Sequence, residues 1–95
     1  YVLATDAEGT ILWNTNVGES VLDLEVANVM GDDAPEIIVA TEGGMVRILD
    51  GAGEILATIA VGDNVTRVVT ADLNGDGNLQ IVAGADDGYV YGNLR

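Results

Sequence analysis

The stretch at residues 72–80 carries side chains with oxygen atoms at alternate positions. Positions 1, 3, 5, 7 and 9 of this loop are Asp72, Asn74, Asp76, Asn78 and Gln80. Calcium prefers about six to eight oxygen ligands, and alternate residues of a tight loop can point toward one centre. Gly75 and Gly77 supply the unusual backbone angles that such a loop needs. The spacing therefore predicts a calcium site formed by these side chains, with Asn78 offering its backbone carbonyl. An Asx-rich surface turn without metal is the alternative.

A second loop, at residues 28–36, has the same length and a weaker set of donors. Its positions 1, 5 and 9 are Asn28, Asp32 and Glu36. Position 3 is Met30, whose thioether is a poor ligand for a hard cation. Two interpretations stay open, a weaker calcium loop or a degenerate turn that Asp33 and Pro35 rigidify without metal. The second is favoured.

The two loops are related by a repeat of 44 residues. Shifting the sequence by this distance gives 14 identities in 51 overlapping pairs without a gap. The identical pairs include Asp6/Asp50, Gly9/Gly53, Leu12/Leu56, Gly31/Gly75, Asp32/Asp76 and Ile37/Ile81. A period in the forties is typical of propeller blades, whereas helical repeats of this length need apolar faces of period 3.6. No such helical face is present.

The apolar patterns between the turns are those of β-strands. Residues 21–26 alternate with period two, as in a half-buried strand, and residues 37–40 form a short continuous apolar run, as in a strand covered on both faces. Gly-containing turns separate these runs. We expect nine strands, at 1–5, 10–16, 21–27, 36–41, 45–49, 54–60, 65–71, 80–85 and 89–93.

This order predicts an all-β fold built of β-propeller blades, each a four-stranded antiparallel sheet within the 44-residue repeat. About two blades are present in a single segment, residues 1–95. It divides into a partial blade at 1–20, a complete blade at 21–64 and a partial blade at 65–95. Such a segment cannot close a ring. We therefore expect its partners to be other blades, from a longer parent chain or from further copies in a homo-oligomer or filament.

Composition excludes several classes of function. The chain has three Lys+Arg against sixteen Asp+Glu, a net charge of −13, and no His or Cys. Three basic residues are too few to form a patch that could bind along the phosphate backbone of a nucleic acid. Without His and Cys, neither a zinc site of the usual kind nor a thiol nucleophile can form. No apolar run is long enough to span a membrane. No signal peptide is recognisable, and the first residue is Tyr rather than Met, so the compartment stays open.

The segment 69–88 resembles the FG-GAP/VCBS-type repeat of integrin-α-like propellers. In that family a strand runs into a D-x-[DN]-x-D-G-x-x-D calcium loop and a strand of the "IVVG" kind follows; here the loop reads D-L-N-G-D-G-N-L-Q and the strand I-V-A-G. An EF-hand or dockerin loop opens in the same way but needs an acidic residue at position 12. That position is Ala83. The family usually has Asp at position 9, so Gln80 implies a weaker site.

This resemblance implies a non-catalytic calcium-binding module for extracellular or cell-surface binding, adhesion or assembly, with a carbohydrate or protein ligand. Two alternatives stay open. The first is a fragment of a polysaccharide lyase, because some of these enzymes carry the same repeats; a sugar-binding cleft lined by Trp13, Tyr89 and Tyr91 would favour it. The second is a structural subunit that stacks head to tail into a ring or filament.

A weaker similarity links residues 4–13 to the repeats of quinoprotein propellers. The run A-T-D-A-E-G-T-I-L-W is a shortened form of their A-x-D-x-x-T-G-x-x-x-W motif. Trp13 is accordingly expected to pack between blades. The acidic pair Asp86-Asp87 is expected to be a solvated hairpin turn.

Overall fold

The computed structural model describes residues 1–31, 34–62, 64–73, 75, 77–86 and 90–91, the last two by their backbone alone. These residues form nine strands and no helix. The strands are β1 (Val2–Thr5), β2 (Ile11–Thr15), β3 (Val21–Ala27), β4 (Glu36–Thr41), β5 (Met45–Leu49), β6 (Ile55–Ala60), β7 (Val65–Ala71), β8 (Gln80–Ala85) and β9 (Val90–Tyr91). The prediction of an all-β fold is confirmed, and the expected strand boundaries agree to within one residue for β1 to β8.

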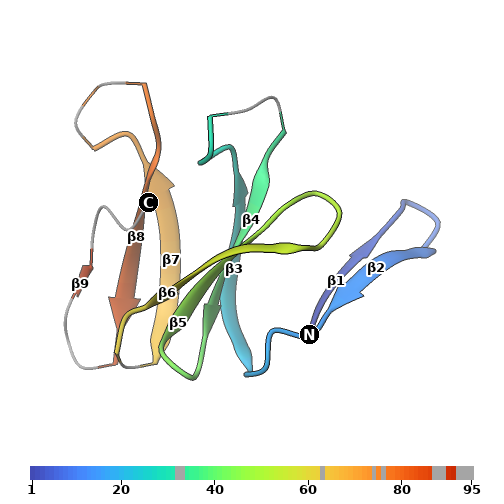
Figure 1. The fold of residues 1–95 in the computed structure, drawn as a ribbon, viewed down its shortest axis with the longest axis horizontal. Coiled ribbons are helices and arrows are strands. Elements are labelled where there is room, and N and C mark those ends of the chain that lie inside the picture. Colours follow the sequence, from blue (N-terminus) through green and yellow to red (C-terminus); the bar gives the residue numbers. More distant parts are fainter. Residues whose placement is uncertain (32–33, 63, 74, 76, 87–89, 92–95) are drawn as a thin grey trace.

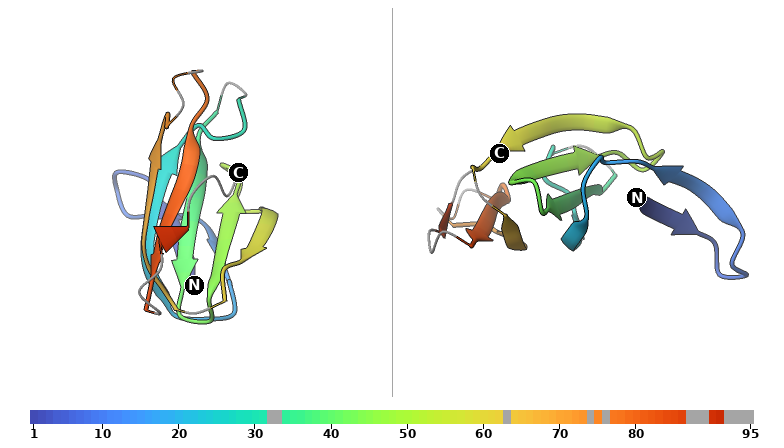
Figure 2. Two further views of the ribbon diagram at one scale, coloured as in Figure 1. Left: turned by 90° about the vertical axis from the view of Figure 1, so that its left-hand side faces the viewer. Right: turned by 90° about the horizontal axis from the view of Figure 1, so that it is seen from below.

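Within the described residues the strands form three antiparallel sheets, each ordered as in the chain. The first sheet is β1-β2, the middle sheet is β3-β4-β5-β6 and the third is β7-β8-β9. The three sheets follow one another across the molecule, with the middle sheet between the other two (Figures 1 and 2). Of the strand expected at 89–93, only residues 90–91 are within the described part of the chain. Each short turn joins neighbouring antiparallel strands, which the Gly-containing turn sequences favour.

The middle sheet has an apolar cluster on each face. The N-terminal cluster lies between the first and middle sheets and consists of Val2, Val17, Val39 and Leu49, with Trp13, Val21 and Ile37 packed against them. The C-terminal cluster lies between the middle and third sheets and consists of Val29, Ile38, Ala40, Val46, Ile48, Val65, Val68, Ile81 and Ala83. Successive residues of a strand point to opposite faces. This alternation explains why β4 reads as a continuous apolar run.

The repeat extends to the hydrogen bonds of the turns. In the β1–β2 turn, Asp6 Oδ1 accepts hydrogen bonds from the backbone N–H groups of Glu8 and Thr10 at 2.9 and 3.0 Å. In the β5–β6 turn, Asp50 Oδ1 accepts the equivalent pair from Ala52 and Glu54 at the same distances. The same residues at the same spacing thus close the same turn, because the interactions that define it are local.

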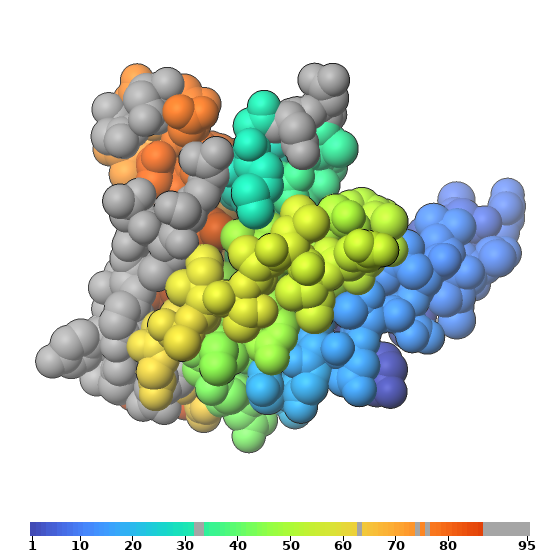
Figure 3. Space-filling model, viewed as in Figure 1, coloured from blue at the N-terminus to red at the C-terminus, as the bar shows by residue number. Residues whose placement is uncertain are grey.

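Trp13 fastens the first sheet to the β5–β6 turn of the middle sheet. Its Nε1 donates a hydrogen bond to the backbone carbonyl of Gly51 at 3.0 Å, and Thr15 Oγ1 donates to the carbonyl of Gly53. The indole lies against Gly53, where a Cβ would come within 2.5 Å of Trp13 Cδ2. In the space-filling view the first sheet, in blue, adjoins this turn (Figure 3). Trp13 is thus a partly buried residue that packs between the first and middle sheets.

We expect Gly53→Ala to destabilise the protein more than the equivalent change Gly9→Ala. Both glycines have positive φ, 85° and 87°, so each substitution costs about 1–2 kcal/mol of backbone strain. Only Gly53 faces a neighbour, since nothing lies within 4 Å of a Cβ built on Gly9. Contact with the Trp13 ring should add about 1 kcal/mol. Urea denaturation of both variants measures the difference, and equal losses would contradict the close packing at Gly53.

Candidate metal-binding loops and a polar cavity

The loop between β7 and β8 is closed by the Asp72 carboxylate. Asp72 Oδ1 accepts a hydrogen bond from Gly75 N and Oδ2 accepts one from Gly77 N, both at 2.8 Å. The two glycines have φ of 76° and 87°, which residues with a side chain rarely adopt. The carboxylate of loop position 1 is therefore turned inward over the loop. Asn74 and Asp76, the candidates at positions 3 and 5, lie outside the described residues.

Gln80 joins the far end of this loop to its start. Its side chain is buried at the beginning of β8, and its Oε1 accepts a hydrogen bond from Leu73 N at 2.8 Å. The predicted ligand at position 9 thus already has a structural partner, although an amide oxygen keeps a second lone pair. Asn78, at position 7, is exposed. The structure brings Asp72 and Gln80 into one closed loop.

The loop between β3 and β4 has the same framework. Asn28 Oδ1 accepts a hydrogen bond from Gly31 N at 3.2 Å, as Asp72 does from Gly75. Glu36 Oε1 accepts from Val29 N at 3.0 Å and from Met30 N at 3.1 Å, and the Glu36 side chain is buried. Asp32 lies outside the described residues. Both loops stand at the same end of their sheets (Figure 1).

The structural role of position 9 is what the sequence reasoning missed. The sequence predicts Glu36 and Gln80 as cation ligands, and in the structure both side chains accept hydrogen bonds from backbone N–H groups at the start of their loops. One signal was present in the sequence. The two residues differ in charge but share length and a carbonyl-type oxygen, so the repeat conserves an acceptor rather than a charge.

The donors of the 72–80 loop fit calcium in kind. Asp72, Asn78 and Gln80 are hard oxygen donors, and the Asp72 carboxylate is folded back over the loop by its hydrogen bonds to Gly75 N and Gly77 N. Among the residues that the structure describes, no three Asp, Glu, His or Cys side chains gather as a group that could hold a metal ion. A site in this loop therefore depends on positions 3 and 5 as well.

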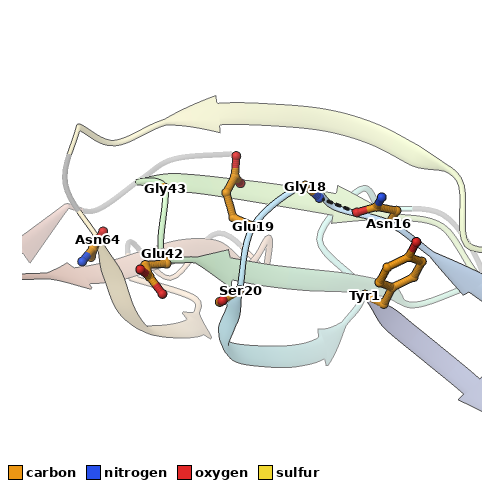
Figure 4. Close-up of a pocket in the computed structure, with 8 residues that line it drawn as sticks. All are labelled: Tyr1, Asn16, Gly18, Glu19, Ser20, Glu42, Gly43 and Asn64. Atoms are coloured by element: carbon orange, nitrogen blue, oxygen red, sulfur yellow. Dashed lines mark hydrogen bonds between the residues drawn. The ribbon is translucent and has the colours of Figure 1, made fainter.

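A polar cavity of about 590 Å³ lies away from these loops. It is lined by Tyr1, Asn16, Gly18, Glu19, Ser20, Glu42, Gly43 and Asn64 (Figure 4). Glu19 lies over Gly43, where a Cβ would come within 2.8 Å of Glu19 Cδ, and Glu19 Oε1 pairs with Arg47 Nη1 at 3.3 Å. Asn16 Oδ1 accepts a hydrogen bond from Gly18 N at 2.9 Å. None of the predicted calcium ligands lines this cavity.

Of the three residues considered for a sugar-binding cleft, only Trp13 has its side chain within the described part of the chain. Trp13 does not line the polar cavity and instead donates its indole N–H to Gly51 of the middle sheet. Tyr89 and the side chain of Tyr91 lie outside the described residues. In the acidic turn, Asp86 is exposed and its Oδ2 accepts a hydrogen bond from Asn64 Nδ2 at 3.2 Å, whereas Asp87 is outside the described part.

Comparison with known proteins assigns no family to the chain. It matches no protein-family model, and no curated protein or solved structure is significantly similar to it. In the described part of the chain, no helix is long and apolar enough to cross a membrane.

Proposed function

We propose that this chain is a calcium-stabilised repeat module of β-propeller type that serves binding or assembly and is not a catalyst. Three features support the proposal. The 44-residue repeat coincides with one four-stranded antiparallel meander. Neighbouring sheets pack face to face through the two apolar clusters. The loops after equivalent strands share one framework.

The observation that carries the calcium assignment is the inward Asp72 carboxylate. Two backbone N–H groups hold it at 2.8 Å, one on each oxygen. An ionised carboxylate has two oxygens with about four lone-pair sites in all, and it can accept hydrogen bonds and bind a hard cation. Side chains of Asp72, Asn74 and Asp76, the carbonyl of Asn78 and the amide oxygen of Gln80 would form the ligand set. Bound calcium would neutralise part of the −13 charge and link the two strands that flank the loop.

We place the module outside the cell or at the cell surface because the resemblance to FG-GAP/VCBS-type repeats implies that location, and a weak calcium site would suit it. The ligand set carries only two carboxylates, since position 9 is Gln80. Calcium affinity rises with the number of charged ligands and with site rigidity, and extracellular modules work at Kd of about 10⁻⁴–10⁻³ M. A two-carboxylate loop suits that range. The 28–36 loop, with Asn28, Asp32 and Glu36, would be weaker still, because Glu36 is engaged with two backbone N–H groups.

Calcium added to chelated protein should raise its melting temperature, and Asp76→Ala should remove most of that rise. A ligand at about 100 times its Kd stabilises the native state by about 2.7 kcal/mol. Asp32→Ala is the matched control, because Asp32 occupies position 5 of the other loop, and it should keep most of the response. Gln80→Glu should tighten binding by roughly tenfold, since it adds a charge at position 9.

Thermal scans with calcium and with chelator, together with calorimetric titration, measure these responses. The quantity compared is the calcium-dependent change of each variant and not its melting temperature alone, because the loop residues also support the fold. An identical calcium response in wild type and Asp76→Ala would show that the loop assignment is wrong.

Catalysis is left out of the proposal on chemical grounds. The sequence has neither His nor Cys, and of the two carboxylates in the polar cavity Glu19 is paired with Arg47. Acyl transfer needs a nucleophile with an adjacent base, and glycoside hydrolysis needs two carboxyl groups on either side of the scissile bond. Turnover of a polysaccharide by the purified chain would overturn this part of the proposal.

A further inference from the structure

The contact between the middle and third sheets shows what covers one face of a repeat. Val68 on β7 is only 2% exposed because it packs into the C-terminal cluster against β3 and β4. Asp23 Oδ2, on β3, accepts a hydrogen bond from Val68 N at 2.9 Å and so joins the first strands of the two sheets. The face of β7 and β8 that carries Val68 therefore fits the facing side of β3 and β4 through apolar packing and this hydrogen bond.

The same repeat positions are uncovered elsewhere in the molecule. Leu24 is the counterpart of Val68 one repeat earlier, and it is 47% exposed; Val26, on the same side of β3, is 59% exposed. On the outer side of the third sheet, Leu73 is 59% exposed, whereas its counterpart Val29 is 1% exposed. Val68 and Val29 belong to the cluster between two sheets, whereas among the described residues no sheet lies against Leu24 or Leu73. An apolar side chain left in this state favours association.

The strands that would cover Leu24 and Val26 can be named from the topology. The first sheet consists of β1 and β2, which correspond to β5 and β6 of the middle sheet. In the middle sheet, β5 pairs on its other side with β4, and β8 is the counterpart of β4 in the third sheet. Within the described residues β1 pairs with β2 alone. Its second edge offers backbone groups to a further strand.

Two independent pairings give one register for that further strand. In the β4–β5 pair, Val39 lies opposite Arg47 and Ala40 opposite Val46. The position equivalent to a β4 residue in β8 is 44 residues later, and the position equivalent to a β5 residue in β1 is 44 residues earlier. The β4–β5 pairing therefore predicts that Ala83 lies opposite Leu3 and that Gly84 lies opposite Val2. In the β8–β9 pair, Ala83 lies opposite Tyr91 and Gly84 opposite Val90. Moving the β9 residues back by two repeats gives the same two pairs.

We propose that β8 of a second copy of this chain pairs with β1, so that β7 and β8 of one copy and β1 and β2 of the next form one four-stranded sheet. This inference rests on the assembly role proposed above but not on the calcium site. The composite sheet covers Leu24 and Val26 of the receiving copy with the outer face of β7 and β8. In this exchange β1 takes the place of β9 along β8. The contact is head to tail, so each copy carries both surfaces.

The charge of the chain makes the association depend on salt. Each copy carries −13, and like charges oppose the approach of two copies until ions screen them over a Debye length of about 8–10 Å. The weight-average mass should therefore rise between low and high ionic strength. The measurement is made in chelator, so that calcium does not contribute.

Sedimentation equilibrium of the 95-residue chain tests the contact. We expect masses above 9.8 kDa that increase with concentration, and a loss of about tenfold or more in association constant for Leu24→Glu. Leu56→Glu is the control, because Leu56 is 48% exposed but lies on β6, away from the proposed strands. It should associate as wild type does.

Cysteine cross-linking tests the register, since the chain has no Cys of its own. The double variant Leu3→Cys/Ala83→Cys should form disulfide-linked dimers and higher species, because directly opposite residues have Cβ atoms about 4.5–5.5 Å apart. The pair Leu3→Cys/Ile81→Cys, two residues out of register, should cross-link at least about tenfold more slowly. If Leu24→Glu leaves the association constant unchanged and both cysteine pairs cross-link at equal rates, this contact is wrong, although the assembly role would still hold. A monomer at every concentration and salt would overturn both.

Discussion

Ile38→Ala is expected to lower the free energy of unfolding by about 4 kcal/mol. Ile38 is fully buried on β4 within the C-terminal cluster, between the middle and third sheets. Removing its methylene and methyl groups forfeits their burial and leaves a cavity that the two packed sheets cannot close, and such changes cost about 2–5 kcal/mol. In a chain of 95 residues each kcal/mol shifts the melting temperature by about 4–8 °C. A fall of roughly 20 °C in a calorimetric scan is the expected result.

The matched control is Val82→Ala, at the same repeat position in the third sheet. Val82 is only partly covered, because the outer face of that sheet has no neighbour within the described chain. Val82→Ala should therefore lower the free energy of unfolding by only about 1 kcal/mol. Similar losses for the two variants would mean that the C-terminal cluster does not hold the middle and third sheets together.

Glu36→Ala is expected to cost about 3 kcal/mol, with or without calcium. The buried Glu36 Oε1 accepts hydrogen bonds from Val29 N and Met30 N. Truncation removes the acceptor and leaves two N–H donors without it, one of them on the buried Val29. Each donor left unsatisfied in the interior costs about 1–3 kcal/mol. Urea denaturation in chelator measures the loss without any contribution from metal.

Glu36→Gln separates the hydrogen-bonding role from a charge-dependent one. The other loop has Gln at the equivalent position, where Gln80 Oε1 accepts a hydrogen bond from Leu73 N in the same way. We expect a loss below about 1 kcal/mol in chelator, because the acceptor is kept. If Glu36→Gln were as damaging as Glu36→Ala, the carboxylate charge rather than the acceptor would stabilise this loop.

The positions of the strands were determined by the sequence to within a residue or so. Alternation in residues 21–26, the apolar run of β4 and the Asp–Gly turns at 6–9 and 50–53 each depend on interactions within a few residues. The 44-residue repeat then predicted that equivalent segments fold alike, and the turns closed by Asp6 and Asp50 share their hydrogen bonds. Local interactions can be read from a sequence because neighbours along the chain are known in advance.

The contacts between sheets were decided by the tertiary structure. Nothing in the sequence near Gly53 indicates that the Trp13 ring lies over it, nor that Gly43 makes room for Glu19. The sequence marked Glu36 and Gln80 as oxygen donors, but which groups those oxygens meet depended on how each loop folds back onto its strand. Leu24 and Val68 hold the same repeat position with similar side chains, and only the packing of neighbouring sheets leaves one exposed and buries the other. Burial depends on partners distant in the chain, and a repeat fixes the shape of each unit without fixing what lies beside it.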